Sequence, residues 1–313
     1  MTLVAGVRTI VVGTRQSALA LTQTGQVIAD LERLAQELGL PFRFETRRIV
    51  TKGDRILDVT LSKVGGKGLF VKEIEQELLD GGIDIAVHSM KDVPHTLEDG
   101  LVIGAVPRRV DPRDVLIARG ARSIAELPHG ARVGTSSLRR VCQLKRLRPD
   151  LNLEPVRGNI DTRIRKLETE GLDAIILAMA GLKRMGWEDR ATAPIPVEEC
   201  LPAVGQGALG VECRADDEEM LALLSRYNDE VSARAVEAER SFLAELNGGC
   251  QVPIGAYAEI AGEEIRLTGM VGTPDGGVLL KESMTGTDAR RLGTELARKL
   301  VELGADRILA DVR

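Results

Sequence analysis

The chain has 313 residues, of which 43% are hydrophobic, and this is enough for two or three domains that each have a core. Its net charge of −5 and aromatic content of 2% argue against a nucleic-acid-binding protein, which needs a basic field and stacking platforms. No apolar run approaches the roughly 18 residues of a spanning helix, and residues 1–10 lack a signal-peptide pattern, so we expect a cytoplasmic protein.

The first third of the chain alternates between strand-like and helix-like patterns. These patterns predict strands at 8–14, 42–50, 83–89 and 100–107 and amphipathic helices at 17–38 and 70–82. Such alternation is typical of α/β layers with largely parallel sheets. The polar, proline-containing stretch at 107–114 then predicts a hinge or linker.

A second α/β unit follows the linker and ends in a proline-rich loop. Its patterns predict strands at 114–119, 131–137, 152–156 and 172–178, helices at 137–147 and 159–171, and a loop at 191–207. Beyond the loop we expect a strand at 207–214 and helices at 216–229 and 230–249. The last part of the chain combines three strand-like runs with a helix at 288–304, which predicts a small α+β domain.

Two α/β units joined by a linker form a cleft, and ligands of open α/β sheets bind beyond the carboxyl ends of strands. Patterns that would indicate nucleotide or metal binding do not fit this context. Residues 205–210 fit the dinucleotide motif G-x-G-x-x-G but precede a strand instead of opening a helix, and the stretch 65–68 lacks the Ser or Thr of a phosphate loop. Metal-ligand spacing is absent from the histidines, His88, His95 and His129.

The motif HSMKDVP, residues 88–94, directly follows a predicted buried strand. A lysine and an aspartate at that position are poorly placed for structure alone, although a solvated loop in which Asp92 starts a turn is the structural alternative. Aspartate is ordinarily ionised at neutral pH, and an ionised carboxylate suits a reaction that develops positive carbon. We therefore interpret Asp92 as an acid–base group or a cation stabiliser.

Arginine supplies 32 of the 42 basic residues, and it grips carboxylates and phosphates with two parallel hydrogen bonds, which lysine cannot do. A codon preference for arginine would give the same composition, so the positions of the arginines must decide between this explanation and anion binding. Cations in the first turn of a helix oppose its dipole, whereas the free N–H groups there favour an anion. Arginines recur at strand–helix junctions in both units, which predicts an anion-binding cleft; they are Arg15, Arg139, Arg140, Arg157 and Arg163.

Cys250 differs from the other cysteines because it follows two glycines in the loop NGGCQVP, residues 247–253. Glycines permit an exposed turn and leave room for a ligand, so this cysteine suits a covalent attachment, although a small buried cysteine is the commoner state. No C-x-x-C pair occurs, which argues against a zinc site or a disulfide framework. We interpret the remaining cysteines as structural: Cys142, Cys200 and Cys213.

Together these motifs resemble the porphobilinogen deaminase (hydroxymethylbilane synthase) family over nearly the whole chain. In family order they are GTRQSALAL, SKVGGKGLFVKE, HSMKDVP, DPRD, VGTSSLRR, RGNIDTR, LPAVGQGALGVECR and NGGCQVPIGA. The resemblance implies two α/β domains similar to periplasmic-binding-protein lobes, with a cleft between them, and a small α+β domain that carries the cysteine. We expect domain 1 at 1–107 and 208–228, domain 2 at 112–203 and domain 3 at 230–313.

The resemblance also implies a transferase of tetrapyrrole, porphyrin and heme biosynthesis. Such an enzyme condenses four porphobilinogen molecules head to tail, releases four ammonia molecules and hydrolyses off linear hydroxymethylbilane. Its cofactor is a dipyrromethane held by a thioether to Cys250, and it requires no metal. Asp92 would assist loss of ammonia, stabilise the azafulvene cation and take the proton from the attacked pyrrole carbon.

Each pyrrole carries an acetate and a propionate, so a chain growing in one cleft needs many carboxylate-binding groups. Besides Cys250, the residues that match the family's cofactor-binding positions are Ser89, Lys91, Thr135, Ser136, Ser137, Arg139, Arg140, Gly158 and Arg163. Those that match substrate-binding positions are Arg15, Ser17, Lys63, Phe70, Arg157, Asn159, Arg184 and Gln206. Lys63 and Phe70 flank a glycine-rich stretch that resembles a mobile lid.

We expect porphobilinogen as the only partner, with no nucleic acid and no membrane, and a monomer. The main alternative is a non-catalytic cytoplasmic protein that captures an anionic ligand between two lobes. Such a binder needs the arginines, but it needs neither Cys250 in a Gly-Gly loop nor an aspartate at a strand end. A regulatory protein that senses such a ligand is a weaker alternative, because the sequence has no DNA-binding signature.

Overall fold

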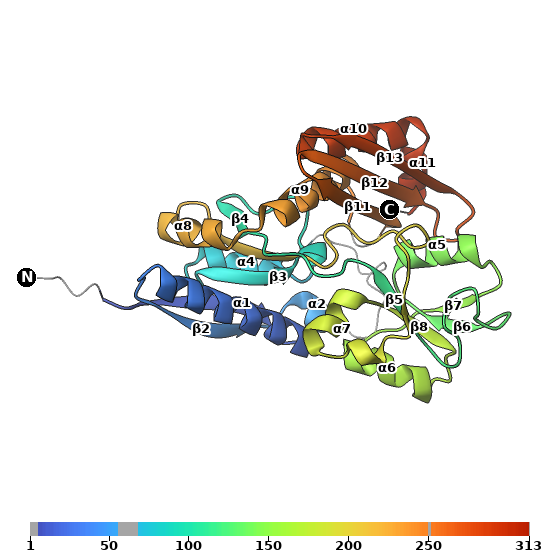
Figure 1. Cartoon of the computed structure of the whole chain (residues 1–313), viewed down its shortest axis with the longest axis horizontal. Helices are drawn as coiled ribbons and strands as arrows, with labels where there is room; N and C mark the ends of the chain where they lie inside the picture. Colours follow the sequence, from blue (N-terminus) through green and yellow to red (C-terminus); the bar gives the residue numbers. More distant parts are fainter. Residues whose placement is uncertain (1–5, 56–67, 250–251, 313) are drawn as a thin grey trace, which may run out of the picture.

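The computed structural model describes residues 6–55, 68–249 and 252–312. In this part of the chain, two five-stranded sheets and one three-stranded sheet each form a layer with their helices (Figure 1). The sequence prediction of two α/β lobes and a small α+β domain is confirmed. None of the helices in the described ranges is long and apolar enough to cross a membrane.

The first sheet is built mainly by the N-terminal part of the chain. Its strands, in spatial order, are β2 (Phe42–Ile49), β1 (Arg8–Arg15), β3 (Ile85–Ser89), β10 (Leu209–Arg214) and β4 (Leu101–Ala105). Its helices are α1 (Ala18–Glu37), the short α2 (Lys52–Arg55), α4 (Lys72–Leu79) and α8 (Glu218–Tyr227). Ser17 caps α1 by accepting a hydrogen bond from the Ala20 N–H, and α1 buries a stripe at Val27 and Leu31 against the sheet.

The second sheet repeats this arrangement. Its strands, in spatial order, are β7 (Asn152–Glu154), β6 (Arg132–Gly134), β8 (Ala174–Ala178), β5 (Asp114–Ala118) and β9 (Ala193–Pro194). Its helices are α5 (Leu138–Leu147), α6 (Ile160–Thr169), α7 (Met179–Met185) and the 3₁₀ turn η2 (Glu188–Arg190). The sequence patterns did not predict α7 or β9, both of which are short.

The prediction of largely parallel sheets is wrong for half of the strand pairs. β1 runs parallel to β2 and β3, and β6 runs parallel to β7 and β8, but β10 is antiparallel to β3 and β4, and β5 is antiparallel to β8 and β9. The reason is the path of the chain. β5 and β10 each enter their sheet directly from the other lobe, so they start at the cleft edge where β1, β3, β6 and β8 end.

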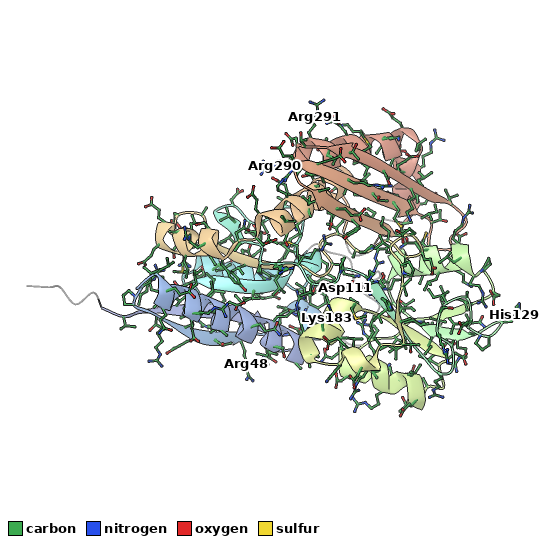
Figure 2. All side chains as sticks on the ribbon, in the orientation of Figure 1. Arg48, Asp111, His129, Lys183, Arg290 and Arg291 are labelled. Carbon is green, nitrogen blue, oxygen red and sulfur yellow. The ribbon has the colours of Figure 1, made fainter. Side chains whose placement is uncertain are left out.

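Two crossover segments, residues 106–113 and 195–208, connect the lobes and lie side by side. The Val110 N–H donates to the Gly207 carbonyl oxygen over 3.2 Å. Gly207 has a φ of +88°, and a Cβ there would lie 2.6 Å from the Val110 oxygen, so this close approach requires glycine. Figure 2 shows Asp111 of the first crossover near the middle of the molecule. Residues 205–210 lead into β10 and open no helix, as predicted for this rejected dinucleotide motif.

The third sheet closes the molecule over the junction of the two lobes (Figure 1). Its strands, β11 (Ile254–Ala261), β12 (Glu264–Gly272) and β13 (Leu279–Gly286), form an antiparallel meander. Helices α9 (Glu230–Glu245), α10 (Ala289–Glu302) and α11 (Ala305–Val312) accompany it, of which α11 was not predicted. α9 and α10 approach closely because Gly293 has no side chain: a Cβ there would lie 2.4 Å from the Ala238 carbonyl oxygen.

Candidate active site

A cavity of about 690 Å³ lies where the strand ends of the two lobes face each other and the loop before β11 approaches them. Strand ends and helix starts from both lobes line it, as do Gly249 and Val252 from the third domain's loop. Among the described lining residues, seven are Arg or Lys and three are Asp. The basic residues are Arg15, Lys91, Arg139, Arg140, Arg157, Arg163 and Arg184, and the acidic ones are Asp54, Asp92 and Asp161.

Asp92 reaches the cavity from the 3₁₀ turn η1 (Met90–Asp92), which directly follows β3. The Met90 N–H donates to the Ala208 carbonyl oxygen over 3.0 Å and fixes the start of this turn to the segment that leads into β10. Arg15, the last residue of β1, places its Nη1 3.9 Å from Asp92 Oδ2. A carboxylate and a guanidinium therefore face each other at the ends of two neighbouring strands.

The guanidinium of Arg15 is fixed on its other sides. Asp54 accepts hydrogen bonds from Arg15 Nε over 3.1 Å and from Nη2 over 2.5 Å, and the Phe70 ring centroid lies 4.1 Å from the guanidinium carbon. Burial by itself would raise the pKa of Asp54, but the hydrogen bonds and charge of Arg15 outweigh it, and the pKa lies below its ordinary value. Asp54 thus holds two nitrogens of Arg15 and leaves Nη1 on the side of Asp92.

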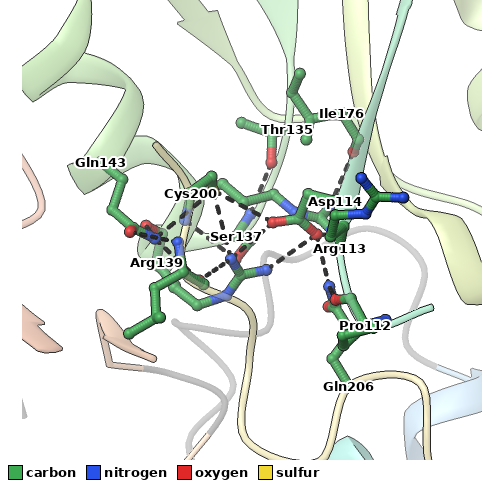
Figure 3. A network of polar contacts seen from close by, with 12 residues as sticks. Pro112, Arg113, Asp114, Thr135, Ser137, Arg139, Gln143, Ile176, Cys200 and Gln206 are labelled. Carbon is green, nitrogen blue, oxygen red and sulfur yellow. Dashed lines mark hydrogen bonds and ion pairs between the residues drawn. The ribbon is translucent and has the colours of Figure 1, made fainter. Parts of the chain in front are cut away.

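Arg139 and Arg140, in the first turn of α5, converge on the buried carboxylate of Asp114. Figure 3 shows Arg139 and Gln206 around this carboxylate. Arg139 Nη1 donates to Asp114 Oδ2 over 2.7 Å, and Arg140 Nη2 donates to Oδ1 over 2.8 Å. Gln206 Nε2 donates to the same Oδ1 over 2.8 Å. Burial would raise the pKa of Asp114, but the two arginines hold it well below its ordinary value. The carboxylate therefore fixes both guanidiniums at the cavity wall.

Arg163 and Arg184 lack such a counter-charge. Arg163 Nε donates to the Gly158 carbonyl oxygen and Arg184 Nη2 to that of Gly207, each over 2.8 Å, and neither forms an ion pair with a described residue. Burial lowers the pKa of Arg163 to about 10, helped by the charge of Arg140 and the nearby Arg157. Burial likewise lowers the pKa of Arg184 to about 10. Cations that are destabilised in this way favour an anionic ligand.

The structure brings most of the predicted site residues to the cavity. Those that line it are Arg15, Ser17, Phe70, Ser89, Lys91, Asp92, Ser136, Ser137, Arg139, Arg140, Arg157, Gly158, Asn159, Arg163, Arg184 and Gln206. Thr135 does not line it: this buried side chain accepts a hydrogen bond from the Ser137 N–H over 3.3 Å and shapes the turn before α5. Lys63 and Cys250 lie outside the described residues, but Gly249 before Cys250 lines the cavity.

Several predicted ligand donors also have structural partners. Ser17 and Ser137 cap α1 and α5, and Ser136 Oγ donates to the Val156 carbonyl oxygen over 2.8 Å. Burial lowers the pKa of Lys91, and the charge of Asp92 offsets this effect only in part. These contacts hold the strand ends in shape, and they leave the arginines as the main source of charge for a ligand.

Three polar residues in or beside the cavity were not among the predicted site residues. Asp54 follows β2 much as Asp92 follows β3, which was a usable signal. Asp114 belongs to the DPRD motif, to which no role was given. Gln23 of α1 donates to Ser89 Oγ over 3.1 Å, and nothing in the helix pattern indicated that contact.

Comparison with known proteins gives family matches over almost the whole chain. A family model described as "Porphobilinogen deaminase, dipyromethane cofactor binding domain" matches residues 10–222, and one described as "Porphobilinogen deaminase, C-terminal domain" matches residues 233–302. The porphobilinogen deaminase of Paenibacillus macerans is 61% identical over 95% of this chain and 98% of its own length. That of Geobacillus kaustophilus is 59% identical over 98% of both chains.

Among solved structures, the VFT2 domain of Bordetella pertussis BvgS (double mutant F375E/Q461E) superposes with a TM-score of 0.42 at 15% identity, covering 74% of this chain and 92% of that domain. The probable amino-acid ABC transporter extracellular-binding protein ytmK of Bacillus subtilis superposes with a TM-score of 0.41 at 13% identity, covering 71% of this chain and 90% of that chain.

Proposed function

Because the chain belongs to the porphobilinogen deaminase family, we propose that Asp92 is the acid–base residue of its reaction and that Cys250 carries its dipyrromethane cofactor. The chain is a hydroxymethylbilane synthase, a transferase of porphyrin and heme biosynthesis that joins four porphobilinogen molecules with loss of ammonia. The observation that supports the proposal best is the carboxylate of Asp92 at a strand end, inside a cavity lined mainly by basic residues.

Each addition of a substrate breaks the C–N bond of its protonated aminomethyl group and one pyrrole C–H bond, forms one C–C bond, and releases one ammonia and one proton. When bound, the dipyrromethane supplies the pyrrole carbon to which the first substrate is joined. The negative charge of Asp92 stabilises the positive carbon that develops as ammonia leaves. Its carboxylate then accepts the proton from the attacked pyrrole carbon. Arg15 Nη1, 3.9 Å from Asp92 Oδ2, orients that carboxylate from the β1 side.

The arginines of the cavity bind the acetate and propionate groups. A hydrogen bond to a charged group contributes roughly 1.5–3 kcal/mol. A carboxylate ligand therefore offsets the burial of Arg163 and Arg184, which have no ion-pair partner among the described residues. Arg140 has a buried Nε with no hydrogen-bond partner among the described residues, and it donates this N–H to the ligand. Arg15 and Phe70 hold the incoming substrate.

The remaining assignments follow the family positions. The cofactor is held by Ser89, Lys91, Ser136, Ser137, Arg139, Arg140, Gly158 and Arg163, and the substrate by Arg15, Ser17, Lys63, Phe70, Arg157, Asn159, Arg184 and Gln206. Thr135 supports the cofactor site through the turn that carries Ser136 and Ser137. The domains comprise residues 1–107 with 208–228, 112–203 and 230–313, and the three sheets support this division because each lies within one of them. The enzyme works in the cytoplasm as a monomer, on porphobilinogen and without a nucleic-acid partner.

The proposal for Cys250 is tested by the intact mass of protein purified from a host that makes porphobilinogen. We expect a covalent adduct of two pyrrole units, absent from Cys250→Ser and retained in Cys142→Ser, whose thiol is buried in the second lobe. An unmodified wild-type mass would contradict the proposal.

The proposal for Asp92 is tested by the turnover of Asp92→Asn at matched cofactor content. We expect turnover to fall by about 10²–10⁴-fold, the usual contribution of a positioned acid–base group. Asp80→Asn, an exposed aspartate at the end of α4, is the control and keeps wild-type turnover. Turnover of Asp92→Asn within a few-fold of wild type would assign the chemistry elsewhere.

A further inference from the structure

Arg240 reaches from the third domain to the segment that follows Asp92. It lies on α9, the helix that leads to the loop before Cys250. Its Nη1 donates to the Val93 carbonyl oxygen over 3.1 Å, and its Nη2 donates to the carbonyl oxygens of Pro94 and His95 over 2.7 and 3.5 Å. One guanidinium thus holds three successive carbonyl groups next to the acid–base residue.

These contacts come at an electrostatic cost. Burial lowers the pKa of Arg240, and the charge of Glu212 only partly offsets this effect. Arg240 forms no ion pair within residues 6–55, 68–249 and 252–312, and its guanidinium donates to backbone carbonyl oxygens instead. The exposed arginines of α10 pair with glutamates, whereas Arg240 is desolvated and donates to the backbone of the segment after Asp92.

The segment after Asp92 needs an external support. The turn η1 closes with the Val93 N–H donating to the Met90 carbonyl oxygen over 3.1 Å, and regular structure resumes only at Leu101 in β4. Pro94 has no N–H to contribute to a ladder. The backbone that carries Asp92 is therefore held by β3 and the Met90–Ala208 hydrogen bond before it and by the Arg240 guanidinium after it.

The other end of this connection is firmly held. Phe242, two residues after Arg240 on α9, is fully buried in the core of the third domain. Glu239, which precedes Arg240, is also buried; it pairs with Arg109 of the first crossover and accepts hydrogen bonds from the Gly205 and Ala258 N–H groups over 2.7 and 2.9 Å. α9 thus joins the third domain to both crossovers and, through Arg240, to the segment after Asp92.

We propose that Arg240 is a positioning residue that sets the carboxylate of Asp92 relative to the third domain, and hence relative to the growing chain that this domain carries. The inference rests on the proposed roles of Asp92 and Cys250. α9 leads from the Arg240 contact toward the loop of Cys250, the proposed point of attachment. A rigid helix there keeps the distance between the reacting carbon and the Asp92 carboxylate the same at each addition. An error of about 1 Å in such a geometry can lower a rate by roughly 10²-fold.

The test compares Arg240→Gln and Arg240→Lys with Arg234→Gln. Arg234 is a matched control because it lies on the same helix and also donates to two carbonyl oxygens, of Gly262 and Glu263, but both are inside the third domain. At matched cofactor content by intact mass, we expect Arg240→Gln to lose about 10–100-fold in kcat with little change in KM. Arg240→Lys recovers part of the loss, and Arg234→Gln keeps wild-type kcat. Wild-type kcat in Arg240→Gln, or an equal loss in Arg234→Gln, would overturn the proposal.

A double variant separates this inference from the proposed function. If Arg240 acts through Asp92, Arg240→Gln has little further effect on kcat in the Asp92→Asn background, because the two effects are coupled. A full additional 10–100-fold loss in that background shows that Arg240 acts elsewhere and overturns the inference, while the role of Asp92 stands. Wild-type turnover in Asp92→Asn alone overturns the proposed role of Asp92, and with it the inference.

Discussion

Replacing Asp114 by asparagine removes the charge around which one wall of the cavity is organised. The carboxylate is fully buried and accepts hydrogen bonds from Arg139, Arg140, Gln206 and the thiol of Cys200. The asparagine has nearly the same shape but leaves two buried guanidiniums without a counter-charge. The effect of this variant is therefore electrostatic and not a matter of packing.

The expected loss in the free energy of unfolding is about 3–5 kcal/mol, the usual cost of removing one partner from a buried ion pair. That is a large part of the roughly 5–15 kcal/mol by which proteins are stable. The control is Asp111→Asn, three residues earlier in the chain. Asp111 pairs with Arg113, whose side chain is 40% exposed, and such a pair contributes only about 0–1 kcal/mol.

Urea unfolding followed by circular dichroism, at matched cofactor content, measures both variants against the wild type. Because the pKa of Asp114 is depressed in the folded state, its contribution is complete above the ordinary value of 3.8 and is lost as the pH falls further. The difference between wild type and Asp114→Asn should therefore be constant from pH 6 to 8. A loss below about 1 kcal/mol, or one equal to that of Asp111→Asn, would refute the assignment of this carboxylate as the anchor of both arginines.

Further predictions concern other buried groups. Burial and the charge of Glu212 raise the pKa of Glu75 above its ordinary 4.5, so the wild type loses stability as the pH rises above about 4.5. In urea unfolding, Glu75→Gln should be more stable than the wild type at pH 7 and equal to it at pH 4. Equal stability at pH 7 would contradict this prediction. Arg163→Gln should weaken the binding of substrate or intermediates by at least about tenfold, because it removes a buried cation that has no ion-pair partner among the described residues. The measurements are KM and the yield of enzyme-bound intermediates. Unchanged values would show that Arg163 is peripheral to binding. Burial raises the pKa of the thiols of Cys142, Cys200 and Cys213 to about 11, 12 and 11. Iodoacetamide at pH 8 should therefore leave these three thiols unlabelled in the native protein. The denatured protein should take three labels, and a fourth label would mean that Cys250 carries no cofactor.

Local patterns in the sequence were sufficient for most strands and helices and for the place of the acid–base residue. Alternating and helical periodicities identified β1 to β8 and the main helices to within a few residues, because burial of one face imposes a period that is visible over ten residues. Asp92 was found because polar residues directly after a buried strand stand at the edge where ligands bind. Clustering of arginines at strand–helix junctions similarly indicated a basic cleft.

The tertiary structure decided which of these charges are paired with one another. Arg139 and Arg140 have a partner in Asp114, Arg15 has one in Asp54, and Arg240 holds the carbonyls that follow Asp92. These partners are distant in the sequence. The antiparallel entry of β5 places Asp114 at the cleft edge, and the parallel pairing of β1 and β2 brings the strand ends near Arg15 and Asp54 together. A periodic pattern reports the side of an element that is buried, but an ion pair depends on the distance between two elements, which only the assembled fold sets.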